Sequence, residues 1–323
     1  MILLTAGLLL QFAQARQPNQ DEPIRLRGEL VVLDAQVLHK KTALAVSNLV
    51  REDFILYEDG VKQHISHFSQ DKLPLSVIVL VDVSGSVWPN LKSFERLRRG
   101  ALEAMRLLKR EDEVALMQFA AKSTLLQSFT RDRDLVVNAL ARLNGRGQRG
   151  TSVDEGILRA ADYMRSASNS DSRRAIIAIT DDVTIALTDR AYTVPTTRAE
   201  GEALRELYES GSVVCALLYD TADPLLEEPR TTGEMAIPRV KRGIAKHFAE
   251  ATGGISIKTS QEDIPTRLTE MIERLRQRYT IGYSATNSSH DGKFRKIKLS
   301  VTPDVERREG SVAVITRKGY YAK

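Results

Sequence analysis

The residues with the clearest chemical potential are an acid and two hydroxyls spaced two positions apart. Asp82, Ser84 and Ser86 come directly after the apolar run 76–81. If that run is a buried strand, the three side chains lie at its carboxyl end, where open α/β sheets place their ligand sites. The pattern has a simpler alternative, because serines at this point also serve as amino-terminal caps of the next helix.

Two further residues favour a metal site. Thr151 follows a glycine-rich loop, and Asp181 follows a second apolar run, 175–179. Three loops would then bring three hydroxyls and two carboxylates to one edge of a sheet. Such oxygen donors suit Mg²⁺, with Mn²⁺ or Ca²⁺ as alternatives, and differ from the His and Cys that zinc prefers. Neutral hydroxyls leave the ion electron-poor, so it would keep an open position for a carboxylate of a partner.

The apolar runs that carry these residues alternate with helical patterns. Four runs of the buried-strand type occupy residues 76–81, 114–119, 175–179 and 213–219. Apolar residues at helical spacing lie between them, for example over 94–108 and 136–143. Alternating strands and helices predict a Rossmann-like fold, a doubly wound, mostly parallel α/β sheet, here over residues 73–278.

The segments on both sides of this α/β unit have β patterns. Residues 25–70 contain several short strand patterns, and the pair Asp59-Gly60 is typical of a tight hairpin turn. Residues 279–323 include the stretch 297–301, in which apolar and polar side chains alternate. Because domain termini often lie close together, we expect the two segments to pair as one small β domain.

The first 15 residues are apolar and end in Ala13-Gln14-Ala15, a pattern that signal peptidases cleave. We therefore expect cleavage after Ala15 and export to the periplasm, the cell surface or the medium. A buried amino-terminal helix is the alternative, because no Lys or Arg precedes the apolar stretch. The segment is shorter than the roughly 20 residues that a membrane span needs, so no transmembrane segment is expected.

Composition excludes several other classes of protein. The chain has 323 residues, 42% of them hydrophobic, and a net charge of +5, which is ordinary for soluble globular proteins. Basic residues are interspersed with acids, as at 95–99 and 273–276, and no basic run alternates with aromatics, so nucleic acid is not an expected partner. The one cysteine, Cys215, lies in an apolar run and is expected to be a buried, unreactive strand residue.

The order Asp-x-Ser-x-Ser, then Thr, then Asp resembles the metal-ion-dependent adhesion site of the von Willebrand factor A (VWA) family, and all five positions match. The resemblance implies a VWA domain over residues 73–278. It also implies that Ser84 and Ser86 bind the metal directly and that Asp82 binds it through water. Thr151 and Asp181 would bind directly or through water, depending on the conformational state.

A second resemblance covers nearly the whole mature chain. The stretches 54–60, 279–283 and 318–321 are similar to the VWFA-related family of exported bacterial proteins, whose function is unsettled. Asp182 departs from that family, in which many members have Gly at this position. We expect this extra carboxylate to tighten metal binding and to weaken the attraction of the ion for an acidic ligand.

These features favour a binding module over an enzyme. The expected function is to hold a divalent cation, Mg²⁺ first, and to use it to capture an acidic group on a protein or cell-surface partner. One alternative is an aspartyl phosphotransferase with Asp82 as nucleophile, although such enzymes usually need a second carboxylate where this chain has Ser84. The other is an interaction scaffold whose metal site is structural or absent, and whose partner binding would survive chelation.

Overall fold

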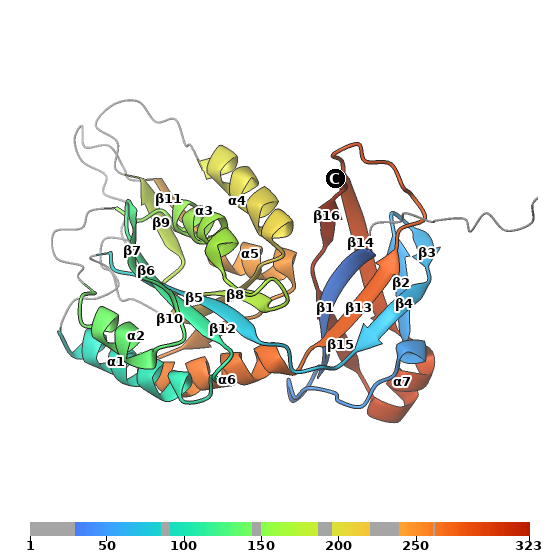
Figure 1. Ribbon diagram of the computed structural model, residues 1–323, viewed down its shortest axis with the longest axis horizontal. Helices are drawn as coiled ribbons and strands as arrows, with labels where there is room; N and C mark the ends of the chain where they lie inside the picture. Colours follow the sequence, from blue (N-terminus) through green and yellow to red (C-terminus); the bar gives the residue numbers. More distant parts are fainter. Residues whose placement is uncertain (1–29, 85–90, 144–149, 187–195, 220–238, 261) are drawn as a thin grey trace, which may run out of the picture.

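A computed structural model of the protein describes residues 30–84, 91–143, 150–186, 196–219, 239–260 and 262–323. Figure 1 shows two lobes side by side, which we call the α/β lobe (residues 75–276) and the β lobe (residues 30–69 and 279–321). The predicted signal sequence and most of the glycine-rich loop before Thr151 lie outside the described residues. Among the residues described, no helix is long and apolar enough to cross a membrane.

The α/β lobe is built on a six-stranded sheet with the strand order β12-β10-β8-β5-β6-β7. The first five of these strands run parallel, and β7 pairs antiparallel with β6. The order reverses at β5, since β6 lies on one side of it and β8 on the other. The strands are β5 (Leu75–Asp82), β6 (Glu113–Phe119), β7 (Ser123–Thr130), β8 (Arg173–Thr180), β10 (Val213–Tyr219) and β12 (Ser256–Thr259).

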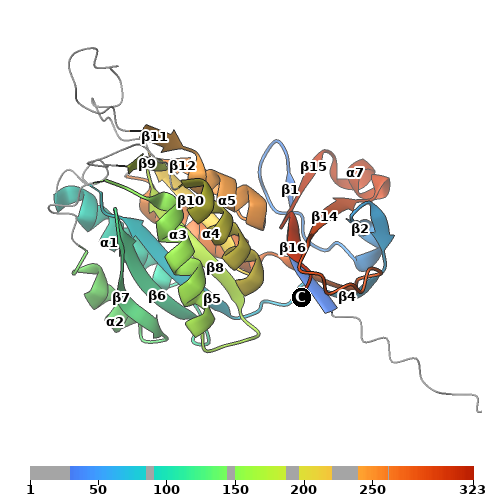
Figure 2. The same cartoon turned by 90° about the horizontal axis from the view of Figure 1, so that it is seen from above.

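Helices cover both faces of this sheet, because its central strands are apolar on both sides. On β5, Val77 and Val81 belong to one core cluster, and Ile78 and Leu80 belong to the other. The first cluster packs under α1 (Leu91–Met105), α2 (Arg133–Leu140) and α6 (Ile264–Arg276). The second packs under α3 (Val153–Tyr163), α4 (Thr196–Ser210) and α5 (Ile244–Thr252), which Figure 2 shows together on one side.

The β lobe consists of two four-stranded antiparallel sheets, with the orders β15-β1-β13-β4 and β16-β14-β2-β3. Each sheet combines strands from both ends of the chain, since β1 pairs with β13 and β15, and β2 pairs with β14. The strands are β1 (Leu30–His39), β2 (Phe54–Glu58), β3 (Val61–Gln63), β4 (Ile65–Ser69), β13 (Tyr279–Ser284), β14 (Phe294–Val301), β15 (Val312–Thr316) and β16 (Gly319–Tyr321), with the short helix α7 (Pro303–Glu309) between β14 and β15.

The interior of the β lobe contains a buried acid, Glu58, that forms hydrogen bonds with residues of two other strands. The carboxylate of Glu58 accepts hydrogen bonds from the hydroxyls of Tyr283, at 2.5 Å, and Tyr320, at 2.9 Å. The hydroxyl of Tyr279 donates to the carbonyl of Val46 at 2.9 Å. Glu58, Tyr283 and Tyr320 come from the three stretches that carry the closer family resemblance. Those stretches are thus the parts of the chain that meet in this core.

The two lobes meet at the amino ends of the parallel strands. Arg173, at the start of β8, has a fully buried side chain that pairs with Asp34 of β1 at 3.1 Å and donates to the carbonyl of Leu275 at 2.8 Å. Only Gln277 and Arg278 separate the end of α6 from the start of β13. The junction is therefore a packed polar contact with short connections.

The carboxyl end of α5 forms a second contact between the lobes. Its carbonyl at Ala251 accepts a hydrogen bond from the amide of Lys318 at 2.9 Å, and the carbonyl of Gly253 accepts one from the guanidinium of Arg278. Gly253 has a φ of 76° and lies so close to the backbone of Thr316 that a Cβ there would collide with it. Lys318 of the β lobe and Arg278 of the connection thus satisfy carbonyls that the helix end leaves without partners.

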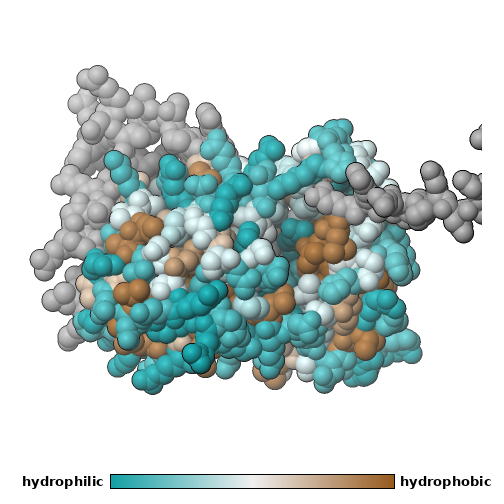
Figure 3. All heavy atoms as spheres, viewed as in Figure 1, coloured by the Kyte–Doolittle hydropathy of each residue, from teal (hydrophilic) through white to brown (hydrophobic). Residues whose placement is uncertain are grey.

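The predicted fold class is confirmed as a doubly wound, mostly parallel α/β sheet with a small β domain formed by the two chain ends. The hairpin turn has positive φ at both Asp59 and Gly60, 47° and 85°. Cys215 is buried in β10 as expected, and burial raises the pKa of its thiol. The small antiparallel ribbon of β9 (Val183–Ala186) and β11 (Arg239–Arg242), as well as β7, α4 and α5, were not anticipated. Figure 3 shows a largely polar surface on the viewed face, with apolar groups that are small and separated.

Candidate functional site

Asp82 ends β5 and has no exposed surface. Its Oδ1 accepts a hydrogen bond from the amide of Ser84 at 2.9 Å, and its Oδ2 accepts one from the hydroxyl of Thr180 at 2.7 Å. Thr180 is the last residue of β8, the strand beside β5. The carboxylate is thus fixed at the point where the strand order reverses, at the end of the α/β lobe away from the β lobe (Figure 1).

The buried position of Asp82 destabilises the charged form of its carboxylate. Burial raises the pKa of Asp82 to about 7, and the negative charge of Asp181 adds to the rise, while hydrogen bonds from Ser84 and Thr180 oppose it. Tyr219, at the end of β10, is also buried near both acids, and its pKa is raised by burial and by their charges. A cation bound between the two carboxylates would remove much of this electrostatic cost.

Asp181 lies in the loop directly after β8 and is partly exposed. One of its carboxylate oxygens accepts a hydrogen bond from the amide of Val183 at 3.1 Å. Asp181 follows Thr180, whose hydroxyl donates to Asp82, so the structure brings together two acids that are about a hundred positions apart in sequence. The more exposed of the two is also the one that a ligand from solvent would meet first.

Asp182 has a structural role that the sequence did not reveal. Its Oδ1 accepts a hydrogen bond from the amide of Ala245 at 2.7 Å, and its Oδ2 accepts one from the amide of Lys246 at 3.2 Å. Both amides belong to the first turn of α5, so this carboxylate caps the positive end of that helix. The expectation that this carboxylate tightens metal binding stays a prediction, and the structure adds that both of its oxygens are engaged by α5. A φ of 58° at Asp182 also explains why Gly suits this position in the family the sequence resembles.

Thr151 is buried, and the loop that contains it is fastened to the ends of neighbouring strands. The amide of Ser152 donates to the carbonyl of Ala120, just beyond β6, at 3.0 Å. The amide of Val153 donates to the hydroxyl of Thr184, in β9, at 3.2 Å. The Thr151 loop is thus held between the end of β6 and the segment that follows Asp181.

Ser84 is buried beside Asp82, whereas Ser86 lies outside the described residues, so only four of the five candidate residues are placed. No group of three or more His, Cys, Asp or Glu side chains in the described part of the chain is arranged to hold a metal.

Thr180 and Tyr219 were not among the site residues predicted from the sequence. The hydroxyl of Thr180 donates a hydrogen bond to Asp82 and accepts one from the backbone amide of Asp182 at 3.0 Å. It therefore connects Asp82 to the loop after β8. Thr180 could have been identified from the sequence, because it lies between the predicted buried strand 175–179 and the candidate residue Asp181. Tyr219 occupies the equivalent place at the end of β10.

The segment that contains the candidate site matches a known family of domains. Residues 77–183 match the family model described as von Willebrand factor type A domain. The chain therefore carries a VWA domain, and the matched range includes all five candidate metal-site positions. A search of curated proteins returns no match to the chain.

Solved structures with a similar fold come from several organisms. The protein BatB from Bacteroides thetaiotaomicron is 20% identical and aligns over 62% of this chain and 98% of its own, with a TM-score of 0.44. The VWF domain of the pilus tip protein Mfa5 from Porphyromonas gingivalis is 13% identical over 63% and 95%, with a TM-score of 0.44. Proximal thread matrix protein 1 of the mussel byssus, with a zinc-occupied metal-ion-dependent adhesion motif, is 16% identical over 63% and 48%, with a TM-score of 0.43. These are likenesses of fold at low identity and do not indicate what this chain binds.

Proposed function

We propose that the protein is an exported, non-enzymatic binding module that captures an acidic group on a protein or cell-surface partner through a divalent cation. The observation that carries this proposal is that Asp82 is fully buried close to Asp181. Burial and the negative charge of Asp181 raise the pKa of Asp82 to about 7. Two acids in this position favour a bound cation, since a cation stabilises the charged form of both. The proposed ligands, directly or through water, are Asp82, Ser84, Ser86, Thr151 and Asp181.

Mg²⁺ is the first candidate for this ion, with Mn²⁺ and Ca²⁺ next, because all the proposed donors are hard oxygens. Zinc belongs in the same test, since the adhesion motif of the mussel thread protein holds zinc. An ion held by hydroxyls keeps more of its positive charge than one held by carboxylates. A carboxylate of the partner is therefore the ligand that best completes its coordination.

A binding role fits Asp82 better than a nucleophilic one. Both of its carboxylate oxygens accept hydrogen bonds, from Ser84 and Thr180, and the side chain is buried. A nucleophilic carboxylate needs an oxygen that can approach the phosphorus atom of a substrate. Metal-dependent turnover of a phosphate ester by the purified protein would contradict this part of the proposal.

Export is proposed on the sequence alone, from the apolar segment that ends at Ala15. Intact mass spectrometry of the protein recovered from outside the cytoplasm tests it. The expected mass is that of a chain beginning at Arg16. A chain that retains Met1 in the exported fraction would contradict the proposed cleavage.

Calorimetry with Mg²⁺, Mn²⁺ and Zn²⁺ tests the cation site. Asp82→Ala should abolish binding, because it deletes one of the two carboxylates assigned to the ion. Asp182→Asn is the matched control, since Asp182 is a neighbouring buried acid whose oxygens face α5. It should keep the cation affinity within a fewfold. Equal loss in both variants, or no loss in either, would show that the ligands are misassigned.

Partner capture is tested by affinity purification from the native organism with and without EDTA. The proposal requires that the partner is lost in EDTA and that free acetate or glutamate at high concentration competes with it. A partner that stays bound in EDTA would favour the alternative in which the domain is a scaffold with a structural or absent metal site.

A further inference from the structure

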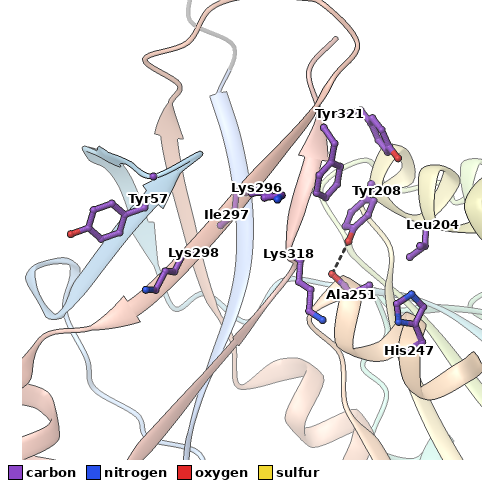
Figure 4. Close-up of a pocket in the computed structure, with 12 residues that line it drawn as sticks. Tyr57, Leu204, Tyr208, His247, Ala251, Lys296, Ile297, Lys298, Lys318 and Tyr321 are labelled. Carbon is purple, nitrogen blue, oxygen red and sulfur yellow. Dashed lines mark hydrogen bonds between the residues drawn. The ribbon is translucent and has the colours of Figure 1, made fainter. Parts of the chain in front are cut away.

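A second candidate site lies between the two lobes. It is an open pocket of about 850 Å³, within the usual range for small-ligand pockets, and lobe interfaces are a common place for them. Tyr208, His247 and Ala251 line it from α4 and α5, and Tyr57 and Lys318 line it from the β lobe (Figure 4). The pocket is at the amino end of the parallel sheet, whereas the cation site is at the carboxyl end. The two sites are therefore separate.

Aromatic rings from both lobes form one wall of this pocket. The ring of Phe294 lies 5.1 Å from that of Tyr208 and 5.2 Å from that of Tyr321, centre to centre. The hydroxyl of Tyr208 donates to the carbonyl of Ala251 at 3.1 Å, which fixes its ring against α5. Burial raises the pKa of Tyr208 to about 12, so this phenol carries no charge near neutral pH. The wall offers a preformed apolar surface to a ligand.

The charged groups that line the pocket are cationic. Lys296, Lys298 and Lys318 all belong to its lining, which includes no Asp or Glu. Lys296 and Lys298 are two residues apart on β14 and therefore extend from the same face of the sheet. Within the described parts of the chain none of the three ammonium groups forms an ion pair, whereas His247 lies 3.8 Å from Glu200. An anion in this pocket would meet uncompensated positive charge.

We propose that this pocket binds a small amphipathic anion, a molecule with an apolar body and one carboxylate or similar acidic group. The apolar body would lie against the rings of Tyr208, Phe294 and Tyr321. The acidic group would lie near the lysine ammonium groups. This site does not depend on the cation, and it stands whether or not the VWA domain captures a partner.

Calorimetry with decanoate, at concentrations below its micelle threshold and in EDTA, tests the pocket on the full chain. Decanol and decyltrimethylammonium are the matched probes, since they share the apolar chain and differ in charge. Decanoate should bind at least tenfold more tightly than either. Binding of decanol equal to that of decanoate, or no binding of decanoate, would overturn the proposal.

Charge-removing variants locate the site. Replacing Lys296, Lys298 and Lys318 together by Gln should weaken decanoate binding at least tenfold, and the hydrogen bond of Lys318 to Ala251 would survive because it uses the backbone amide. The control replaces three exposed lysines elsewhere, Lys40, Lys41 and Lys258, and changes the net charge equally. Equal weakening in both variants would show a general charge effect and would overturn the assignment to this pocket.

A second pair of variants tests the location of the decanoate site without changing any lysine. Tyr57 lines the pocket from β2 and is half-buried, so it can be replaced by polar residues at modest cost. Tyr57→Glu and Tyr57→Gln have nearly the same shape and differ in charge. Decanoate should bind the Glu variant several times more weakly than the Gln variant at low salt. Equal affinity, with both variants showing a normal thermal unfolding transition, would also overturn the proposal.

Discussion

At the scale of single residues, Asp82 and Asp182 are both buried acids at the same edge of the sheet, yet their hydrogen bonds give them different roles. The charged form of Asp82 is destabilised by burial and by the negative charge of Asp181, whereas the carboxylate of Asp182 accepts hydrogen bonds from two backbone amides of α5. The sequence could identify Asp82 and Asp181 because Asp82 directly follows one apolar run and only Thr180 separates Asp181 from another. It could not reveal the role of Asp182, because its partner Ala245 is 63 positions away.

The raised pKa of Asp82 predicts how the stability of the metal-free protein depends on pH. In the unfolded chain an Asp titrates near 3.9, and in the folded protein Asp82 titrates near 7. Between these values the folded state binds more protons than the unfolded state. The free energy of unfolding should therefore fall as the pH rises from about 4 to 7, by at most about 1.4 kcal/mol per pH unit from this group.

Denaturant unfolding in EDTA at pH 5 and pH 8 measures this dependence. The wild type should lose stability at the higher pH relative to Asp82→Asn, which has no charge to bury at either pH. The free energies of unfolding of the two proteins would differ most at pH 8, where Asp82 is ionised. Parallel pH profiles for the wild type and Asp82→Asn would mean that Asp82 does not have the raised pKa.

At the scale of elements, the apolar runs predicted β5, β6, β8 and β10 well. Short, continuous apolar runs are typical of strands that are buried on both faces. The edge strand β7 was missed because its side chains are mostly half-exposed or exposed and do not alternate cleanly. Helix α5 was missed as well. Much of its buried face consists of small alanine side chains, which give a weak periodic signal, and its amino-terminal cap comes from Asp182 in another loop.

The buried Glu58 on β2 predicts a large effect on the β lobe. Glu58→Ala should lower the free energy of unfolding by about 2 to 4 kcal/mol, because it removes the acceptor of one buried and one partly buried tyrosine hydroxyl and leaves a void. Asp59→Asn is the control, since it is the adjacent acid but is exposed and belongs to the turn. Its cost should stay below about 1 kcal/mol. Chemical denaturation of both variants checks the prediction, and similar losses would contradict it.

At the scale of the whole molecule, the β lobe depends on strands from both ends of the chain. The sequence allowed this to be predicted because two β segments flank one α/β unit. It did not show the contacts that join the lobes, such as Arg173 with Asp34 and Lys318 with Ala251. Those contacts link residues that are between 60 and 140 positions apart, so no local pattern signals them.

A chain that ends at Arg278 tests this dependence. It lacks β13, β14 and β15, the partners of β1 and β2, so the amino-terminal strands should lose their order. Hydrogen exchange should then show little protection over residues 30–69, while the central strands β5 and β8 stay protected. Retained protection over 30–69 would show that the amino-terminal segment folds without its carboxyl-terminal partners.

The placement of the site and the lobe junction at opposite ends of the same strands has a mechanical consequence. A partner held at Asp82 would pull on the carboxyl end of β5, and the β lobe is attached near the amino end at Leu75. The load would run along the strand, and β5 is hydrogen-bonded on both sides, to β6 and β8. Those hydrogen bonds lie across the direction of pull and would share the tension in shear, so they would not open one after another.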